Sequence, residues 1–216
     1  MKKYKLAMLC GRFSHIHNGH KMIIDKGIEL CEKVLVLVGS SQESHTLRNP
    51  FTADFRIELI KKVYDNNPNI RIEKLDDLTN EYDITYDWGQ YVIDKTTEYS
   101  GQKADLIITG NDEMRKGWFS EEQMQGVTEL SIDRQKIKIS ATELRGYVLL
   151  NNKEEWQKYI PGEIITEFEK IRQQLLEVKI YQKILKEIGE EKTIENFQKV
   201  YEKYEIEDKE RKIRNI

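Results

Sequence analysis

Hydrophobic and polar positions follow two different patterns along the first part of the chain. Short, nearly continuous apolar runs, such as residues 34–38, are typical of strands that are covered on both faces of a parallel sheet. Four runs of this kind are predicted strands: 5–10, 33–39, 70–75 and 104–109. A fifth short strand is expected near either 127–131 or 136–139.

Between these runs, apolar residues recur at helical spacing. The segment 53–64 places Phe55, Leu59 and Ile60 near one face of a helix. Helices are predicted over 21–31, 53–64 and 88–99. Because strands and helices alternate, we expect βαβ units and a Rossmann-like, doubly wound α/β fold with a parallel sheet.

After residue 140 the pattern is helical only, with predicted helices over 142–150, 163–176, 179–188 and 193–204. We expect a main domain over 1–174 and a charged helical C-terminal extension over 175–216. We expect this extension to influence assembly or solubility more than chemistry.

Composition narrows the functional classes. The chain has 216 residues, enough for one good core, and 35 Lys and Arg residues against 38 Asp and Glu residues. A net charge of −3 does not favour nucleic-acid binding. The apolar runs are too short to cross a bilayer, so we expect no membrane contact. Cys10 and Cys31 form no metal-binding pattern, and they indicate a reducing, cytoplasmic setting.

The first chemical motif is His17-Asn18-Gly19-His20, which lies where a predicted strand gives way to a helix. Residues three apart at the start of a helix lie on one face, so both imidazoles can reach one polyphosphate. Gly19 lets a nucleotide approach the backbone closely, and the helix N-terminus offers free N–H groups. The alternative is a turn with two surface histidines.

The second motif is residues 139–145, Ile-Ser-Ala-Thr-Glu-Leu-Arg. Ser140 and Glu143 have the spacing of a capping box, which would explain those two residues alone. Thr142 and Arg145 add a hydroxyl and a guanidinium at the same helix start, which is typical of an anion site.

Together the two motifs resemble the paired signatures of the nucleotidylyltransferase superfamily. Residues 39–52 are similar to the second-strand loop of archaeal-type nicotinamide mononucleotide (NMN) adenylyltransferases, which carry a G-S-A-Q stretch, an arginine and an N/D-P-F-T run. Residues 86–89, 109–112 and 156–171 resemble that family's tryptophan segment, G-N loop and closing W-x-x-x-(I/L)-P segment. The similarity covers residues 4–172 and leaves out the tail.

The resemblance implies three sets of site residues. It implies catalytic contacts with phosphates for His17, His20, Arg48, Ser140 and Arg145. It implies ATP binding by Gly11, Arg12, Phe13, Gly19, Gly110, Asn111 and Thr142. It implies mononucleotide binding by Ser40, Asp87 and Trp88, with the Trp88 ring stacked on nicotinamide. Judged on spacing alone, Trp88 is more typical of a core anchor than of a stacking residue, and Asp87 has a helix cap as its alternative role.

The implied reaction joins ATP and NMN to give NAD and pyrophosphate. The attacking 5′-phosphate is already ionised near neutral pH, so no strong general base is required. Mg²⁺ is expected on the phosphates, held largely by phosphate and water, and a homo-oligomer is expected. The alternatives are another phosphorylated acceptor, such as nicotinate mononucleotide or phosphopantetheine, and a nucleotide-sensing module without activity. Residues 42–52 and Trp88 argue against phosphopantetheine.

Overall fold

A parallel sheet of five strands, in the order β3-β2-β1-β4-β5, forms the centre of the computed structural model. The structure describes residues 1–65, 67–79, 85–110, 117–132 and 139–214. The strands are β1 (Tyr4–Gly11), β2 (Cys31–Val38), β3 (Ile70–Lys74), β4 (Leu106–Gly110) and β5 (Thr128–Ile132). The predicted α/β fold is confirmed. The fifth strand takes the first of its two expected positions, and the other expected position falls mostly outside the described residues.

Helices cover both faces of the sheet. They are α1 (Asn18–Leu30), α2 (Ala53–Tyr64) and α3 (Tyr86–Ser100). Side chains alternate along a strand, so Val34 and Val36 pack with α1 and α2, whereas Leu35 and Leu37 pack with α3. This two-sided burial explains why the strands are continuous apolar runs.

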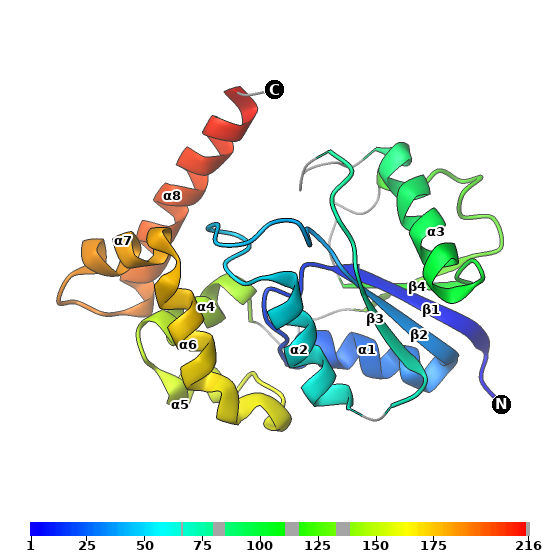
Figure 1. Cartoon of the computed structure of the whole chain (residues 1–216), viewed down its shortest axis with the longest axis horizontal. Coiled ribbons are helices and arrows are strands. Elements are labelled where there is room, and N and C mark those ends of the chain that lie inside the picture. Colours follow the sequence, from blue (N-terminus) through cyan, green and yellow to red (C-terminus); the bar gives the residue numbers. More distant parts are fainter. Residues whose placement is uncertain (66, 80–84, 111–116, 133–138, 215–216) are drawn as a thin grey trace.

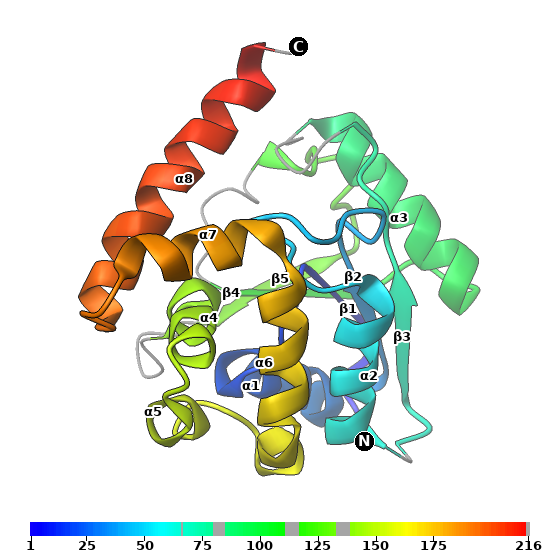
Figure 2. The same cartoon turned by 60° about the vertical axis from the view of Figure 1, so that its left-hand side comes forward.

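The rest of the described chain is helical. It contains α4 (Ala141–Leu149), α5 (Lys153–Gln157), the 3₁₀ helix η2 (Gly162–Glu167), α6 (Phe168–Glu177), α7 (Lys179–Ile188) and α8 (Ile194–Arg214). The predicted helix over 163–176 is divided between η2 and α6. The short helix α5 was not predicted, because five residues give too little periodicity. These helices gather beside one end of the sheet, and the far half of α8 projects outward (Figures 1 and 2).

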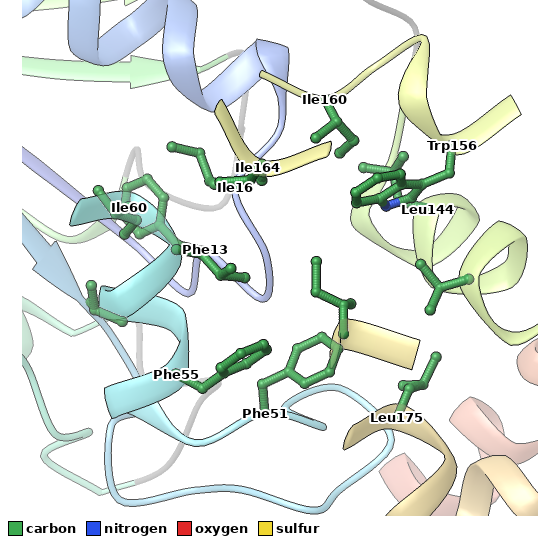
Figure 3. Close-up of a cluster of buried hydrophobic side chains, with 14 of the residues drawn as sticks. Phe13, Ile16, Phe51, Phe55, Ile60, Leu144, Trp156, Ile160, Ile164 and Leu175 are labelled. Atoms are coloured by element: carbon green, nitrogen blue, oxygen red, sulfur yellow. The ribbon is translucent and has the colours of Figure 1, made fainter. Parts of the chain in front are cut away.

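One buried cluster joins the sheet and the C-terminal helices. Figure 3 shows Phe13, Phe51 and Phe55 facing Leu144 and Trp156 across a shared interior. The same cluster continues into α7 and α8 through Tyr181, Ile184, Phe197 and Tyr201. The division of the chain at residues 174 and 175 therefore stays a prediction. Across the described ranges, no helix combines the length and the apolar character needed to cross a membrane.

Candidate active site

The candidate site begins at the carboxyl ends of β1 and β4. The chain builds the sheet outward from β1 through β2 to β3, and β4 then pairs with the other side of β1. Ligands of open α/β sheets bind at such a switch point, next to the carboxyl ends of the strands. Gly11 ends β1 and Gly110 ends β4, so these two predicted ATP-site glycines flank the switch point. Asn111 lies outside the described residues.

The two histidines of the first motif meet as predicted. The ring centroids of His17 and His20 are 3.8 Å apart, and the Phe13 ring lies 4.8 Å from His20. His17 caps α1, because its Nδ1 accepts a hydrogen bond of 3.1 Å from the buried backbone N–H of Gly19. In the neutral imidazole the proton is therefore on Nε2, which makes Nε2 a donor suited to a phosphate oxygen.

His15 connects the two motifs. It is fully buried, and its Nε2 accepts a hydrogen bond of 2.9 Å from Trp156 Nε1. Burial, followed by the positive charges of His17 and Arg145, lowers the pKa of His15 to about 3. The imidazole is therefore neutral at physiological pH, and it lies within electrostatic range of both His17 and Arg145.

The loop after β2 carries Ser40 and Arg48. Ser40 is buried with a left-handed backbone (φ 47°), and its hydroxyl donates to Asp77 at 3.1 Å. Ser14 donates to the Arg48 carbonyl at 3.2 Å, which ties this loop to the turn after β1. The Arg48 Nε lies 3.9 Å from a carboxylate oxygen of Glu205 in α8. Arg48, the predicted phosphate-binding residue of this loop, thus lies beside the turn that leads to His17.

A residue that the sequence reasoning missed holds both loops. Arg56 in α2 is fully buried and donates from Nη1 to the carbonyls of Arg12 at 2.6 Å and Gly39 at 2.8 Å. Its Nη2 donates to the Ser40 carbonyl at 3.0 Å. Burial, followed by the charge of Arg12, lowers the pKa of Arg56 to about 10. The available signal was a cation on the apolar face of α2, one turn before Leu59.

The second motif opens α4. Ser140 caps this helix by accepting a hydrogen bond of 3.0 Å from the Glu143 N–H. The Glu143 carboxylate accepts instead from the hydroxyl of Tyr147 at 2.8 Å, so only half of the capping box forms in the described structure. Thr142 accepts a hydrogen bond of 3.0 Å from Nη2 of Arg145. The capping interpretation explains Ser140 and leaves Thr142 and Arg145 for another role.

Arg145 is buried by residues from the C-terminal helices. It is 4% exposed, and its Nε donates to the Tyr181 hydroxyl at 2.7 Å. Its Nη2 also donates to the Tyr201 hydroxyl at 2.9 Å. Burial raises the pKa of Tyr181, so this phenol stays protonated and can both accept and donate. Neither tyrosine was predicted from the sequence to have a role in the site.

Trp88 lies in the first turn of α3, on the other face of the sheet. It is buried, and its ring packs edge-on against Trp118 with centroids 5.6 Å apart. Its Nε1 has no hydrogen-bond partner within the described structure. Thr85 caps α3 by accepting from the Trp88 N–H at 3.3 Å, which leaves Asp87 exposed in the first turn without the capping role. The substrate contacts of Trp88 and Asp87 stay predictions.

No cluster of three or more His, Cys, Asp or Glu side chains suited to a metal ion occurs in the part of the chain that the structure describes.

Comparison with known proteins agrees with this geometry. Residues 8–147 match the family model described as cytidylyltransferase-like. The chain is 32% identical over 160 residues to the nicotinamide-nucleotide adenylyltransferase of Methanococcus vannielii, a match that covers 74% of this chain and 85% of that relative. It is 29% identical over 168 residues to the enzyme of the same name from Thermococcus sibiricus, covering 77% of this chain and 84% of the relative.

A solved structure shares the fold at lower identity. The bifunctional NMN adenylyltransferase/ADP ribose pyrophosphatase of Francisella tularensis superposes with a TM-score of 0.66 at 17% identity. The match covers 85% of this chain and 55% of that protein, so this chain spans about half of it. The sequence matches lead to one assignment: the chain belongs to the cytidylyltransferase-like family and, within it, to the nicotinamide-nucleotide adenylyltransferases.

Proposed function

We propose that this protein transfers the adenylyl group of ATP to NMN, which yields NAD and pyrophosphate. The observation that supports this most strongly is a set of hydrogen bonds between the parts of the site. Arg145 donates to the Tyr181 hydroxyl at 2.7 Å, and Tyr181 donates to the Leu47 carbonyl at 2.8 Å. Ser14, in the turn that precedes His17, donates to the carbonyl of the neighbouring Arg48 at 3.2 Å. The archaeal relatives are named for this activity, and the match covers most of their length.

In this proposal the chain acts by alignment and charge neutralisation. The 5′-phosphate of NMN attacks the α-phosphorus of ATP in line, its P–O bond forms, and the bond to pyrophosphate breaks. Donors fixed before the reaction stabilise charge on the α-phosphate and on the leaving group without reorganising. His17 Nε2, His20, Arg48 and Arg145 are such donors. Ser140 adds a hydroxyl at the start of α4, and no side chain is needed to deprotonate the nucleophile.

Mg²⁺ fits this proposal as a partner of ATP. Mg²⁺ prefers oxygen ligands, and the phosphates and water would supply most of them. The ion would neutralise charge on the β- and γ-phosphates. A crystal structure of the Francisella protein is a complex with AMP and a manganese ion.

Ser40, at the carboxyl end of β2, and the first turn of α3 with Asp87 and Trp88 would bind the mononucleotide. Nicotinate mononucleotide is the second candidate acceptor, because it shares the phosphate and ribose of NMN. It differs only by a carboxylate in place of the carboxamide on the ring.

One assay tests the activity and the acceptor together. The protein is incubated with ATP, Mg²⁺ and either NMN or nicotinate mononucleotide, and pyrophosphate and dinucleotide are measured. We expect one pyrophosphate for each NAD formed, with NMN as the better acceptor. Phosphopantetheine serves as a control acceptor and should give no product. ATP binding without release of pyrophosphate would refute the enzymatic proposal and favour a nucleotide-sensing protein.

A further inference from the structure

The C-terminal helices reach the candidate phosphate site through two buried phenols. Tyr181 of α7 is 0% exposed and Tyr201 of α8 is 2% exposed. Their hydroxyls lie 2.7 Å and 2.9 Å from Nε and Nη2 of Arg145. The Arg145 guanidinium carbon also lies 5.5 Å from the centroid of the Tyr201 ring, within the range of a cation–π contact.

The hydrogen bonds select one edge of the guanidinium. Tyr181 uses the Nε proton, and Tyr201 and Thr142 use both protons of Nη2. These are three of the five N–H donors of an arginine. Within the described structure, Nη1 donates to no acceptor, so its two protons stay available for phosphate oxygens. The phenols therefore fix the plane of the guanidinium without using the Nη1 donors.

The same two hydroxyls connect Arg145 to the loop of Arg48. Both donate to the carbonyl of Leu47, Tyr181 at 2.8 Å and Tyr201 at 3.4 Å. A carbonyl has two lone pairs and can accept both bonds. Leu47 directly precedes Arg48, so the phenols hold two predicted phosphate-binding arginines in one network.

A close helix contact keeps the phenols in place. Gly146, next to Arg145, lies directly beneath the start of α8. A Cβ atom there would come within 2.5 Å of the Ile194 side chain and 2.6 Å of the Phe197 ring, so any other residue would require these side chains to shift. Phe197 is itself fully buried. Helix α8 therefore packs closely on α4 at Gly146, directly beside Arg145.

We propose that Tyr181 and Tyr201 are positioning residues for Arg145 and that helices α7 and α8 complete the triphosphate site. This inference rests on the proposed function only for the identity of the nucleotide that Arg145 contacts. It reverses the expectation that the extension affects assembly more than chemistry. A long side chain held by packing and hydrogen bonds loses less entropy when substrate binds, and it stays in the orientation that the reaction needs.

The test compares Tyr181→Phe, Tyr201→Phe and their double variant with the matched control Tyr204→Phe. Phenylalanine keeps the ring packing and removes only the hydroxyl. Tyr204 lies in the same helix as Tyr201, but its hydroxyl donates to Glu187, away from Arg145. We expect the double variant to lose about tenfold or more in kcat/KM for ATP, with KM for NMN nearly unchanged, because bonds to a charged group are lost. The control should behave as wild type.

Two further measurements separate positioning from stability. In an Arg145→Ala background, the tyrosine changes should cause no additional loss in kcat/KM, because they act through that arginine. Additive losses would overturn the proposal. Calorimetry with inorganic tripolyphosphate tests the same network without any assumption about the acceptor. We expect weaker binding by the double variant and unchanged binding by the control.

The outcomes distinguish this inference from the proposed function. If neither the wild type nor any variant forms NAD, yet the double variant still binds tripolyphosphate more weakly, the proposed function fails and the positioning role stands. If the double variant binds tripolyphosphate as tightly as wild type or more tightly, the phenols do not position Arg145 for phosphate, and the inference fails even when NAD is formed.

Discussion

Replacing Arg56 with methionine should loosen both loops of the candidate site at once. The guanidinium donates three short hydrogen bonds, to the carbonyls of Arg12, Gly39 and Ser40. Two of these carbonyls stand at strained places, because Phe13, which follows Arg12, and Ser40 both have φ near 47°. Non-glycine residues in this region persist only where their surroundings hold them. Methionine fills a similar space but donates no hydrogen bond.

The size of the effect follows from two opposing contributions. Three hydrogen bonds to a charged group contribute about 5–9 kcal/mol together. Burial, followed by the charge of Arg12, lowers the pKa of Arg56 to about 10, which corresponds to a cost of about 3 kcal/mol for the buried charge. The hydrogen bonds outweigh this cost, and Arg56→Met should reduce the free energy of unfolding by about 2–6 kcal/mol.

Urea denaturation of the wild type and the variant measures this difference, and steady-state kinetics at low temperature measure its effect on the site. We expect KM to rise for ATP and for NMN, because Arg12 and Ser40 stand on the two sides of the proposed site. Lys61→Met, which removes an exposed charge from the same helix, is the control and should change stability by less than about 0.5 kcal/mol. An Arg56→Met protein with wild-type stability and wild-type KM values would refute the reasoning.

The remaining predictions concern three other residues. His20→Ala should lower kcat about a hundredfold or more, because a phosphate contact of the transition state is lost, and near wild-type turnover would exclude this role. Trp88→Ala should raise KM for NMN far more than KM for ATP, and equal changes would mean that the buried ring only packs. The pKa of His15 is about 3 in the folded protein, against an ordinary value of 6.5. As the pH falls, His15 therefore becomes protonated in the unfolded chain before it does so in the folded protein. Its contribution to stability is present above pH 6.5 and declines by up to about 1.4 kcal/mol per pH unit as the pH falls toward 3. Denaturation between pH 7 and 4 should show a shallower decline for His15→Gln than for wild type, and an unchanged slope would contradict this role of His15.

Much of the fold could be predicted because it depends on local patterns. Continuous apolar runs marked the buried strands, and the alternation of Val34, Leu35 and Val36 between two faces explains why these runs carry no polar positions. The first phosphate motif was also local, since His17 and His20 lie in one turn of one helix. Helix α5 could not be predicted, because its five residues complete little more than one turn.

The parts that could not be predicted depend on distant contacts. Arg56 reaches carbonyls 16, 17 and 44 residues away along the chain, and no periodicity encodes such partners. Tyr181 and Tyr201 have the spacing of ordinary apolar positions in amphipathic helices, and only the folded chain shows their hydroxyls against Arg145. A sequence pattern identifies which face of a helix is buried, but it does not identify the polar group on the other side.

The hydrogen bonds to Leu47 have a consequence for biosynthesis. The Leu47 carbonyl is separated from Tyr181 by 134 residues and from Tyr201 by 154 residues. Contacts of such long range form late, because the intervening chain must be made and folded before they close. A nascent chain that has produced every strand of the sheet and all of α4 still lacks both phenols beside Arg145. The order of translation thus places the completion of this network after the synthesis of every strand of the sheet.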